Sequence, residues 1–249
     1  MAGLQEAYGG QISRFSLATG EPKIDKAVRV VVAFGGKAAA RTYPDRVTVI
    51  SCLAPGTHVR DGQRRNVVNI PMTPNADMIL GKLRQIQPSL RRLAVPWISD
   101  AIEGQVRQLE RVAGVEVWVA RLTQREDLPD RLREMLDAKV EALWLPPDPL
   151  LINAQSLLMI KTFCWANDIP FYVPTAGLVK QGAVGAVACS FRTMGRTAGQ
   201  VTRQVLEGGQ YESVVYPTQV EIILSRTAAS NSGVVIPAQM WQDAVQVLP

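Results

Sequence analysis

The pattern of apolar and polar positions predicts buried strands that alternate with helices. Short apolar runs bounded by glycine, proline or aspartate are typical of buried parallel strands. Such runs lie at Val28–Phe34, Arg46–Leu53, Val67–Ile70, Arg92–Ile98, Gly114–Ala120, Ala142–Leu145, Pro170–Val173 and Gly182–Cys189. Helical patterns lie at Asn75–Gln87, Ala101–Val112, Leu128–Asp137, Leu150–Asn167, Met194–Glu207 and Met240–Val247. Weaker patterns predict a strand at Gln11–Leu17, a helical turn at Lys23–Val28 and an extended segment at Val214–Ile223. This alternation predicts an α/β protein with two parallel three-layer lobes.

The central stretch of the chain gives the clearest unit, a strand, a crossover helix and a second strand between residues 140 and 175. Its loops, Pro146–Pro149 and Thr175–Gly177, follow the ends of predicted strands. Open α/β sheets bind ligands at the carboxyl ends of their strands. We therefore look for a binding site in these loops.

A second candidate is the turn Gly35-Gly36-Lys37-Ala38, which joins a strong strand to an alanine-rich segment. A helix that starts after such a turn presents free backbone N–H groups, which suit a carboxylate or a phosphate. The turn is neither a Walker A loop nor a dinucleotide fingerprint, and a tight strand-to-helix connection is the alternative interpretation.

Composition excludes several classes of function. The net charge of +5 is spread along the chain without a block of basic residues, which favours a solvated surface over a nucleic-acid partner. The three cysteines form no CxxC pair, and His58 is the single histidine. These counts argue against a zinc site and against Ser-His or Cys-His catalysis. We expect no cofactor. We expect the thiols of Cys164, in a predicted helix, and Cys189, in an apolar strand, to be buried as small apolar groups.

No apolar run is long enough to span a bilayer, and the first residues, MAGLQEAYGG, carry no signal-peptide pattern. The chain is therefore expected either to work in the cytoplasm or to have lost its leader.

The order of several short segments resembles a known family. The segments are AFGGKAA (33–39), NVVNI (66–70), PSLRRLAV (88–95), GAV (182–184) with MGR (194–196), and GVVIP (233–237). Together they resemble the substrate-binding proteins of ABC transporters of the tryptophan/tyrosine type, over residues 25–249. That family has the type I periplasmic binding-protein fold.

The resemblance implies a small organic ligand held in a cleft between two lobes that close by a hinge. It implies delivery to an ABC permease in the membrane, a periplasmic or extracytoplasmic location, and no enzymatic activity. The expected ligand-binding residues are Gly35, Gly36, Lys37, Ala38, Trp97, Ser99, Asp100, Asp148, Thr175, Ser190 and Arg192. The expected lobes are residues 1–72 with 192–213, and residues 73–190; residues 214–249 form a last crossover and a tail packed across both.

The chain departs from the family pattern in ways that bear on the ligand. Ser190 stands where many members have aspartate, so an α-amino group loses a partner, and Arg192 favours an anion instead. Ala54-Pro55 replaces Asp-Pro, and Ser225 replaces asparagine. The ligand is thus expected to be a small carboxylate or an amino-acid-like molecule.

The first strand of the family and most of its first helix have no counterpart here; only Gly3–Tyr8 can be a helix remnant. Either the chain is truncated at its start or the first lobe is degenerate. A lobe without that strand would expose strand edges or rearrange, and our hypothesis is a homodimer through the first lobe.

Some candidate residues also have ordinary structural interpretations. Trp144 and Trp165 fit core positions, whereas Trp97 ends a strand on the ligand side. Asp148 is either a solvated turn carboxylate or a ligand group, and Asp100 can cap a helix.

Two other functions are compatible with this fold. One is a cytoplasmic ligand-sensing domain of the repressor type, although no DNA-binding headpiece is visible. The other is a homologue that has lost its ligand. An enzyme is disfavoured because no nucleophile–base pair is recognisable.

Overall fold

The computed structural model describes residues 1–54 and 66–249, and it divides them into two compact units. Unit 1 contains residues 1–72 and 190–219, and unit 2 contains residues 73–189 and 220–249. His58, and Pro55 of the Ala54-Pro55 pair, lie outside the described residues.

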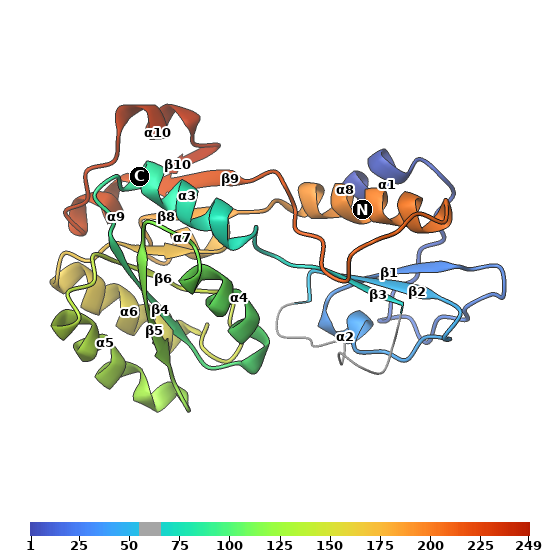
Figure 1. The fold of residues 1–249 in the computed structure, drawn as a ribbon, viewed down its shortest axis with the longest axis horizontal. Helices are drawn as coiled ribbons and strands as arrows, with labels where there is room; N and C mark the ends of the chain where they lie inside the picture. The colour runs from blue at the N-terminus through green and yellow to red at the C-terminus, as the bar shows by residue number, and fades with distance from the viewer. Residues whose placement is uncertain (55–65) are drawn as a thin grey trace. The chain divides into compact units, whose positions relative to one another are not determined.

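Unit 1 is built on a three-stranded parallel sheet. Its strands are β1 (Val30–Phe34), β2 (Thr48–Cys52) and β3 (Val67–Ile70), in the order β1-β2-β3. Helix α8 (Phe191–Leu206) contacts all three strands, and the short helix α2 (Gly36–Ala39) contacts β1 and β2. Figure 1 shows α8 and α1 (Ala2–Tyr8) on one side of this sheet and α2 on the other.

Glycines bring α1 very close to α8. A Cβ added at Gly3 would lie 2.0 Å from the backbone oxygen of Arg192, and one at Gly199 would lie 2.8 Å from that of Leu4. A Cβ added at Gly195 would likewise lie 3.0 Å from the backbone nitrogen of Leu4. Small residues spaced along a helix allow two backbones to approach this closely. The predicted helix remnant is thus confirmed as α1, docked on α8.

Unit 2 contains a seven-stranded sheet in the order β10-β9-β8-β7-β6-β4-β5. The strands are β4 (Arg92–Trp97), β5 (Glu116–Arg121), β6 (Ala142–Trp144), β7 (Phe171–Val173), β8 (Gly185–Ala188), β9 (Glu221–Ser225) and β10 (Gln246–Leu248). Strands β4 to β8 are parallel, and β9 runs antiparallel to β8 with β10 parallel to β9.

Helices cover both faces of this sheet, so the predicted three-layer arrangement is confirmed for unit 2. One core cluster takes side chains from α3 (Ala76–Ile86), α4 (Asp100–Glu110), α9 (Arg226–Asn231) and α10 (Ala238–Asp243). The other takes side chains from α5 (Leu128–Asp137), α6 (Ala154–Ala166) and α7 (Ala176–Val179), with a 3₁₀ turn at Arg125–Asp127 before α5. Within the described residues, no helix is long and apolar enough to cross a membrane.

Several predicted elements differ from the structure. Gln11–Leu17 forms no strand, since most of its side chains are exposed and no strand pairs with it. Lys23–Val28 forms no helix, but it contains one hydrogen-bonded turn, in which the N–H of Val28 donates to the carbonyl of Asp25 at 3.1 Å. The terminal helix begins at Ala238, after Pro237, and ends at Asp243, so that Gln246–Leu248 can pair with β9. Within the predicted extended segment Val214–Ile223, only Val214, in an isolated bridge, and the first residues of β9 pair with other strands. Helix α9 was not predicted from the sequence.

The three cysteines are free and buried, which was expected for Cys164 and Cys189. Burial raises the pKa of Cys52 and of Cys189 to about 12, and it also raises that of Cys164. An unfolded thiol ionises near its ordinary value of 9.0, whereas the folded thiol stays protonated. This contribution to stability is complete below pH 9 and is lost as the pH rises toward 12.

We therefore expect the free energy of unfolding to fall between pH 9 and 11 by at most about 1.4 kcal/mol per pH unit for each thiol. Urea unfolding of the wild type and of Cys52→Ala across this range measures it. A wild type and a variant with the same pH slope would contradict the assignment for Cys52.

Candidate functional site

The predicted ligand loops of unit 2 follow three neighbouring strands of one sheet. The Trp97–Asp100 segment begins at the last residue of β4, Pro146–Pro149 follows β6 and Thr175 follows β7. Because β4, β6 and β7 are adjacent and parallel, these loops leave the same edge of the sheet. The carboxyl edge of such a sheet is the usual place for ligands.

Asp148 holds two of these loops together. Its side chain is 0% exposed, so the interpretation as a solvated turn carboxylate is wrong. One carboxylate oxygen accepts the N–H groups of Ile98 and Ser99 at 2.6 and 2.8 Å, and the other accepts those of Leu150 and Leu151 at 2.8 and 3.3 Å. The four donors balance the buried charge, so that Asp148 fixes the β4–α4 loop against the β6–α6 loop.

Trp97 and Trp144 place two indole N–H groups on the same side of the unit 2 sheet. Both rings belong to one core cluster and are nearly completely buried, with exposed fractions of 4% and 1%. Neither indole nitrogen has a hydrogen-bond partner among the described residues. Trp165, in contrast, donates to the carbonyl of Gly182 at 3.1 Å. Buried N–H groups normally find an acceptor, so two without one are candidate donors to a bound molecule.

The remaining predicted residues of unit 2 have local partners. Ser99, not Asp100, is the N-cap of α4, and its hydroxyl accepts the N–H of Ala101 at 3.3 Å. Asp100 pairs with Arg121 at 2.7 Å, and that guanidinium stacks 4.9 Å from the centroid of Trp97. Thr175 is half-buried at the start of α7.

In unit 1 the Gly35–Ala38 turn has the expected geometry. Gly35 adopts a φ of 90° and a ψ of 158°, a combination that is essentially restricted to glycine. Its N–H donates to the carbonyl of Cys52 at 2.8 Å, so the turn stays attached to β2. Gly36, Lys37 and Ala38 then form the first turn of α2, whose backbone N–H groups have no partner within the helix.

Ser190 and Arg192 belong to the first turn of α8. Ser190 is the N-cap, and its hydroxyl accepts the N–H of Thr193 at 3.1 Å. Arg192 contacts a carboxylate of the chain itself, because its guanidinium binds Glu6 of α1 with N–O distances of 2.6 and 3.2 Å. Arg196 adds a third contact to Glu6 at 3.0 Å. The hydrogen bond from Arg192 is the main cause that lowers the pKa of Glu6, while desolvation opposes it.

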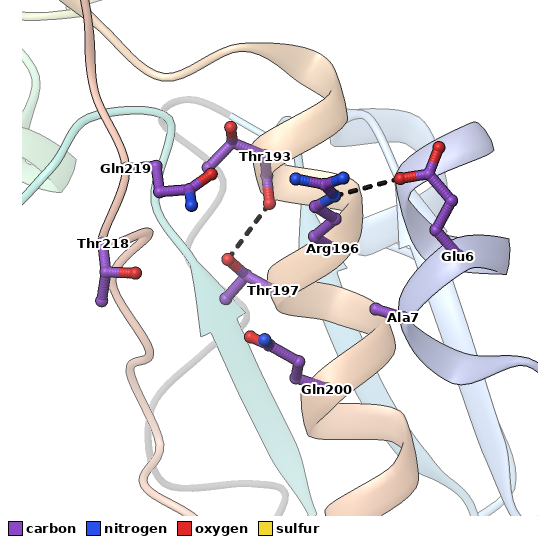
Figure 2. Close-up of a pocket in the computed structure, with 8 residues that line it drawn as sticks. All are labelled: Glu6, Ala7, Thr193, Arg196, Thr197, Gln200, Thr218 and Gln219. Carbon is purple, nitrogen blue, oxygen red and sulfur yellow. Dashed lines mark hydrogen bonds and ion pairs between the residues drawn. The ribbon is translucent and has the colours of Figure 1, made fainter.

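A polar cavity of about 320 Å³ lies within unit 1 and was not predicted. It is lined by Glu6 and Ala7 of α1, by Thr193, Arg196, Thr197 and Gln200 of α8, and by Thr218 and Gln219. Figure 2 shows the α8 residues along one side of that helix, with Arg196 reaching toward Glu6. Glu6 carried no sequence signal, because only the docking of α1 brings it to α8. Among residues 1–54 and 66–249, no group of His, Cys, Asp and Glu could hold a metal ion.

One family model matches most of the chain, and several solved structures share its fold. Residues 83–248 match a family described as ABC transporter substrate binding protein. A structure from Streptococcus pneumonia, described as an ABC domain in complex with L-Trp, has a TM-score of 0.64 and 20% identity, with 90% of this chain and 80% of that chain covered. A ligand-free, open substrate binding protein with adhesive properties from Clostridium difficile has a TM-score of 0.62 and 16% identity, with 88% and 78% covered. A conserved domain protein from Vibrio cholerae has a TM-score of 0.62 and 14% identity, with 98% and 82% covered. No curated protein matches the chain.

Proposed function

Because the chain belongs to the ABC transporter substrate-binding protein family, we propose that it captures a small carboxylate or amino-acid-like solute for an ABC importer. The solute would bind in a cleft between the two units, which would close on it by a hinge. Capture followed by release to a membrane permease requires no chemical step, so we propose no catalytic residue. This function places the protein outside the cytoplasm, where such family members work.

The observation that carries this proposal is the Gly35 turn with its open helix start. Three backbone N–H groups, from Gly36, Lys37 and Ala38, come from one helical turn whose own carbonyls cannot satisfy them. A carboxylate has two oxygens and accepts several such bonds, which are stronger when the acceptor is charged. We assign the ligand carboxylate to this turn.

Unit 2 supplies further ligand groups in this proposal. The buried indole N–H of Trp97 lacks an acceptor and is the donor we assign to the ligand, with Thr175 as a second polar group. Asp148 and Ser99 act by holding the loops in place, since their side chains are bonded to backbone N–H groups. Asp100 and Arg192 are each paired within the chain, so either would contact a ligand only after leaving Arg121 or Glu6.

A thermal-shift screen of the purified protein tests the function. We expect a dose-dependent rise in melting temperature with one class among amino acids, aromatic acids and short carboxylates, with L-Trp included because a similar structure is described as holding it. A ligand at a hundredfold excess over its Kd adds about 2.7 kcal/mol of stability. Sugars serve as the contrasting class. A folded sample with a flat response to every class would overturn the proposal and would identify a homologue without a ligand.

Two substitutions at Gly36 then locate the carboxylate. Gly36→Ala and Gly36→Pro both add a Cβ, but only proline removes the backbone N–H, and proline is tolerated in the first turn of a helix. We expect Gly36→Pro to bind at least tenfold more weakly than Gly36→Ala, since a hydrogen bond to a charged group contributes about 1.5–3 kcal/mol. Equal affinities by isothermal titration would place the carboxylate elsewhere and leave the solute-binding function intact.

A second copy of the chain is a further expected partner, because β1 pairs with only one neighbouring strand in the described part of unit 1.

A further inference from the structure

The polar cavity of unit 1 is separate from the groups assigned to the solute above. Its lining comes from three segments, α1, α8 and residues 218–219, and all three belong to unit 1. The Gly35–Ala38 turn is not among the described residues that line it, and Figure 1 shows α2 on the other side of the unit 1 sheet from α8. Its volume of about 320 Å³ lies at the small end of the range for sites that hold small molecules.

The charges at this cavity leave one positive charge without a partner. Glu6 and Arg196 are the charged residues of its described lining, and Arg192 binds Glu6 from outside the lining. Two guanidinium groups therefore share a single carboxylate. An anion in the cavity would restore the balance.

Arg196 also has unused hydrogen-bond donors. A guanidinium carries five N–H groups. Arg196 uses the one on Nε, which donates to Glu6 at 3.0 Å, and its terminal nitrogens donate no hydrogen bond within the described part of the chain. Two terminal nitrogens of one guanidinium suit the two oxygens of a carboxylate. The contact between Arg192 and Glu6 shows this paired geometry within the chain itself.

Uncharged polar side chains form the rest of the lining. Thr193, Thr197 and Gln200 are three and four positions apart on α8, so they share one side of that helix. Figure 2 shows Thr218 and Gln219 across from them. The side chains of Gln200, Thr218 and Gln219 form no hydrogen bond with residues 1–54 or 66–249.

These amides and hydroxyls indicate what the remainder of a ligand is like. An amide and a hydroxyl group can each donate and accept, and the hydroxyl groups of a ligand do the same. Ala7 is the only apolar residue among the described lining, and no aromatic side chain belongs to it. An aromatic or aliphatic ligand would bury little apolar surface here, whereas a hydroxylated one would find several partners.

We propose that this cavity is a second binding site, which takes a small hydroxylated carboxylate such as a sugar acid. The carboxylate binds the terminal nitrogens of Arg196, and the hydroxyl groups bind the amides and hydroxyls of α8 and residues 218–219. A neutral sugar would leave the positive charge without a partner, and a simple carboxylate would leave the uncharged side chains unused. This inference does not depend on the solute-binding function proposed above.

Isothermal titration of the whole chain with three probes tests the ligand class. D-gluconate carries both a carboxylate and hydroxyl groups, D-glucose carries hydroxyl groups without a charge, and acetate carries the charge without hydroxyl groups. We expect D-gluconate to bind at least about tenfold more tightly than either of the others, because it alone uses Arg196 and the uncharged side chains together. No binding of D-gluconate, or equal affinity for D-glucose or acetate, would overturn the proposal.

Substitutions locate D-gluconate within unit 1. Arg196→Gln should lower its affinity about tenfold or more, since a hydrogen bond to a charged group is lost. Arg203→Gln is the matched control, because Arg203 is also on α8 and also contacts α1, donating to the carbonyl of Tyr8 at 3.4 Å, but it does not line the cavity. Thr218→Val removes a hydroxyl group and keeps the shape; it should weaken binding about threefold, and it covers an Arg196→Gln chain that fails to fold. Equal losses in Arg196→Gln and Arg203→Gln, or an unchanged affinity in Thr218→Val, would contradict the assignment.

Gly36→Pro separates this site from the one proposed for the transported solute. The affinity for D-gluconate should persist in Gly36→Pro and fall in Arg196→Gln. The reverse pattern would place the carboxylate of D-gluconate at the Gly35 turn, and it would overturn the second site while supporting the solute-binding function. A response to amino acids in the thermal-shift screen together with no titration of D-gluconate would overturn the second site alone.

Discussion

Replacing Asp148 with alanine is expected to lower the free energy of unfolding of unit 2 by about 3 kcal/mol or more. The carboxylate is fully buried and accepts four backbone N–H groups from two loops. Removing it leaves those donors without partners, and each orphaned buried donor costs about 1–3 kcal/mol. Local relaxation and entering water will recover part of this sum, so the lower end of the range is the firm expectation.

Urea unfolding, followed for each unit by hydrogen exchange, measures the loss. The transition of unit 2 should move to lower urea while that of unit 1 stays in place, because the four N–H groups that Asp148 accepts all belong to unit 2. Asp130→Ala is the matched control, since Asp130 is an exposed carboxylate in a surface pair with Arg133, and such pairs contribute about 0–1 kcal/mol. An Asp148→Ala variant as stable as Asp130→Ala would contradict the assignment.

Asp148→Asn separates the charge from the shape. The amide keeps one acceptor but turns an NH₂ group toward two N–H donors, so we expect most of the loss to remain. Both variants should also weaken the binding of any solute, because the β4–α4 and β6–α6 loops lose their common anchor. Stability that falls without any change in affinity would place the ligand away from these loops.

The sequence was most informative where burial is strongest. The apolar runs of β4, β6, β7 and β8 are buried on both faces. Their pattern therefore predicted that these segments are strands, and it also predicted how they alternate with the helices. The weak alternation at Gln11–Leu17 predicted a strand wrongly, because extended backbone needs a neighbour with which to pair, and local pattern contains no information about that neighbour.

The candidate site was predictable in position but not in its contacts. Strand ends and the Gly35–Gly36 turn located the loops, since topology decides where parallel strands end. The role of Asp148 as a loop anchor and the pairing of Glu6 with Arg192 join residues 49 or more positions apart. Such contacts depend on tertiary packing, and single residues without a motif do not indicate them.

Gly199→Ala is expected to displace α1 from α8 and to destabilise unit 1 by about 1–3 kcal/mol. Its new Cβ would lie 2.8 Å from the carbonyl oxygen of Leu4, 2.8 Å from the Cβ of Ala7 and 2.9 Å from the backbone nitrogen of Tyr8. Two of these atoms are backbone, so α1 must move as a whole. Forcing an extra methyl into a tight contact costs about 1–3 kcal/mol.

A second glycine separates this contact from helix propensity. Gly104 lies within α4 and has open space around its missing Cβ, so Gly104→Ala should stabilise its helix by about 0.8–1 kcal/mol. Opposite signs for the two alanines in urea unfolding, with faster hydrogen exchange at residues 2–8 only in Gly199→Ala, are the expected result. If both substitutions stabilised equally, α1 would not pack on Gly199. The pairing of Glu6 with Arg192 and Arg196 would then be a contact of a mobile segment, and both arginines would be available to an anion.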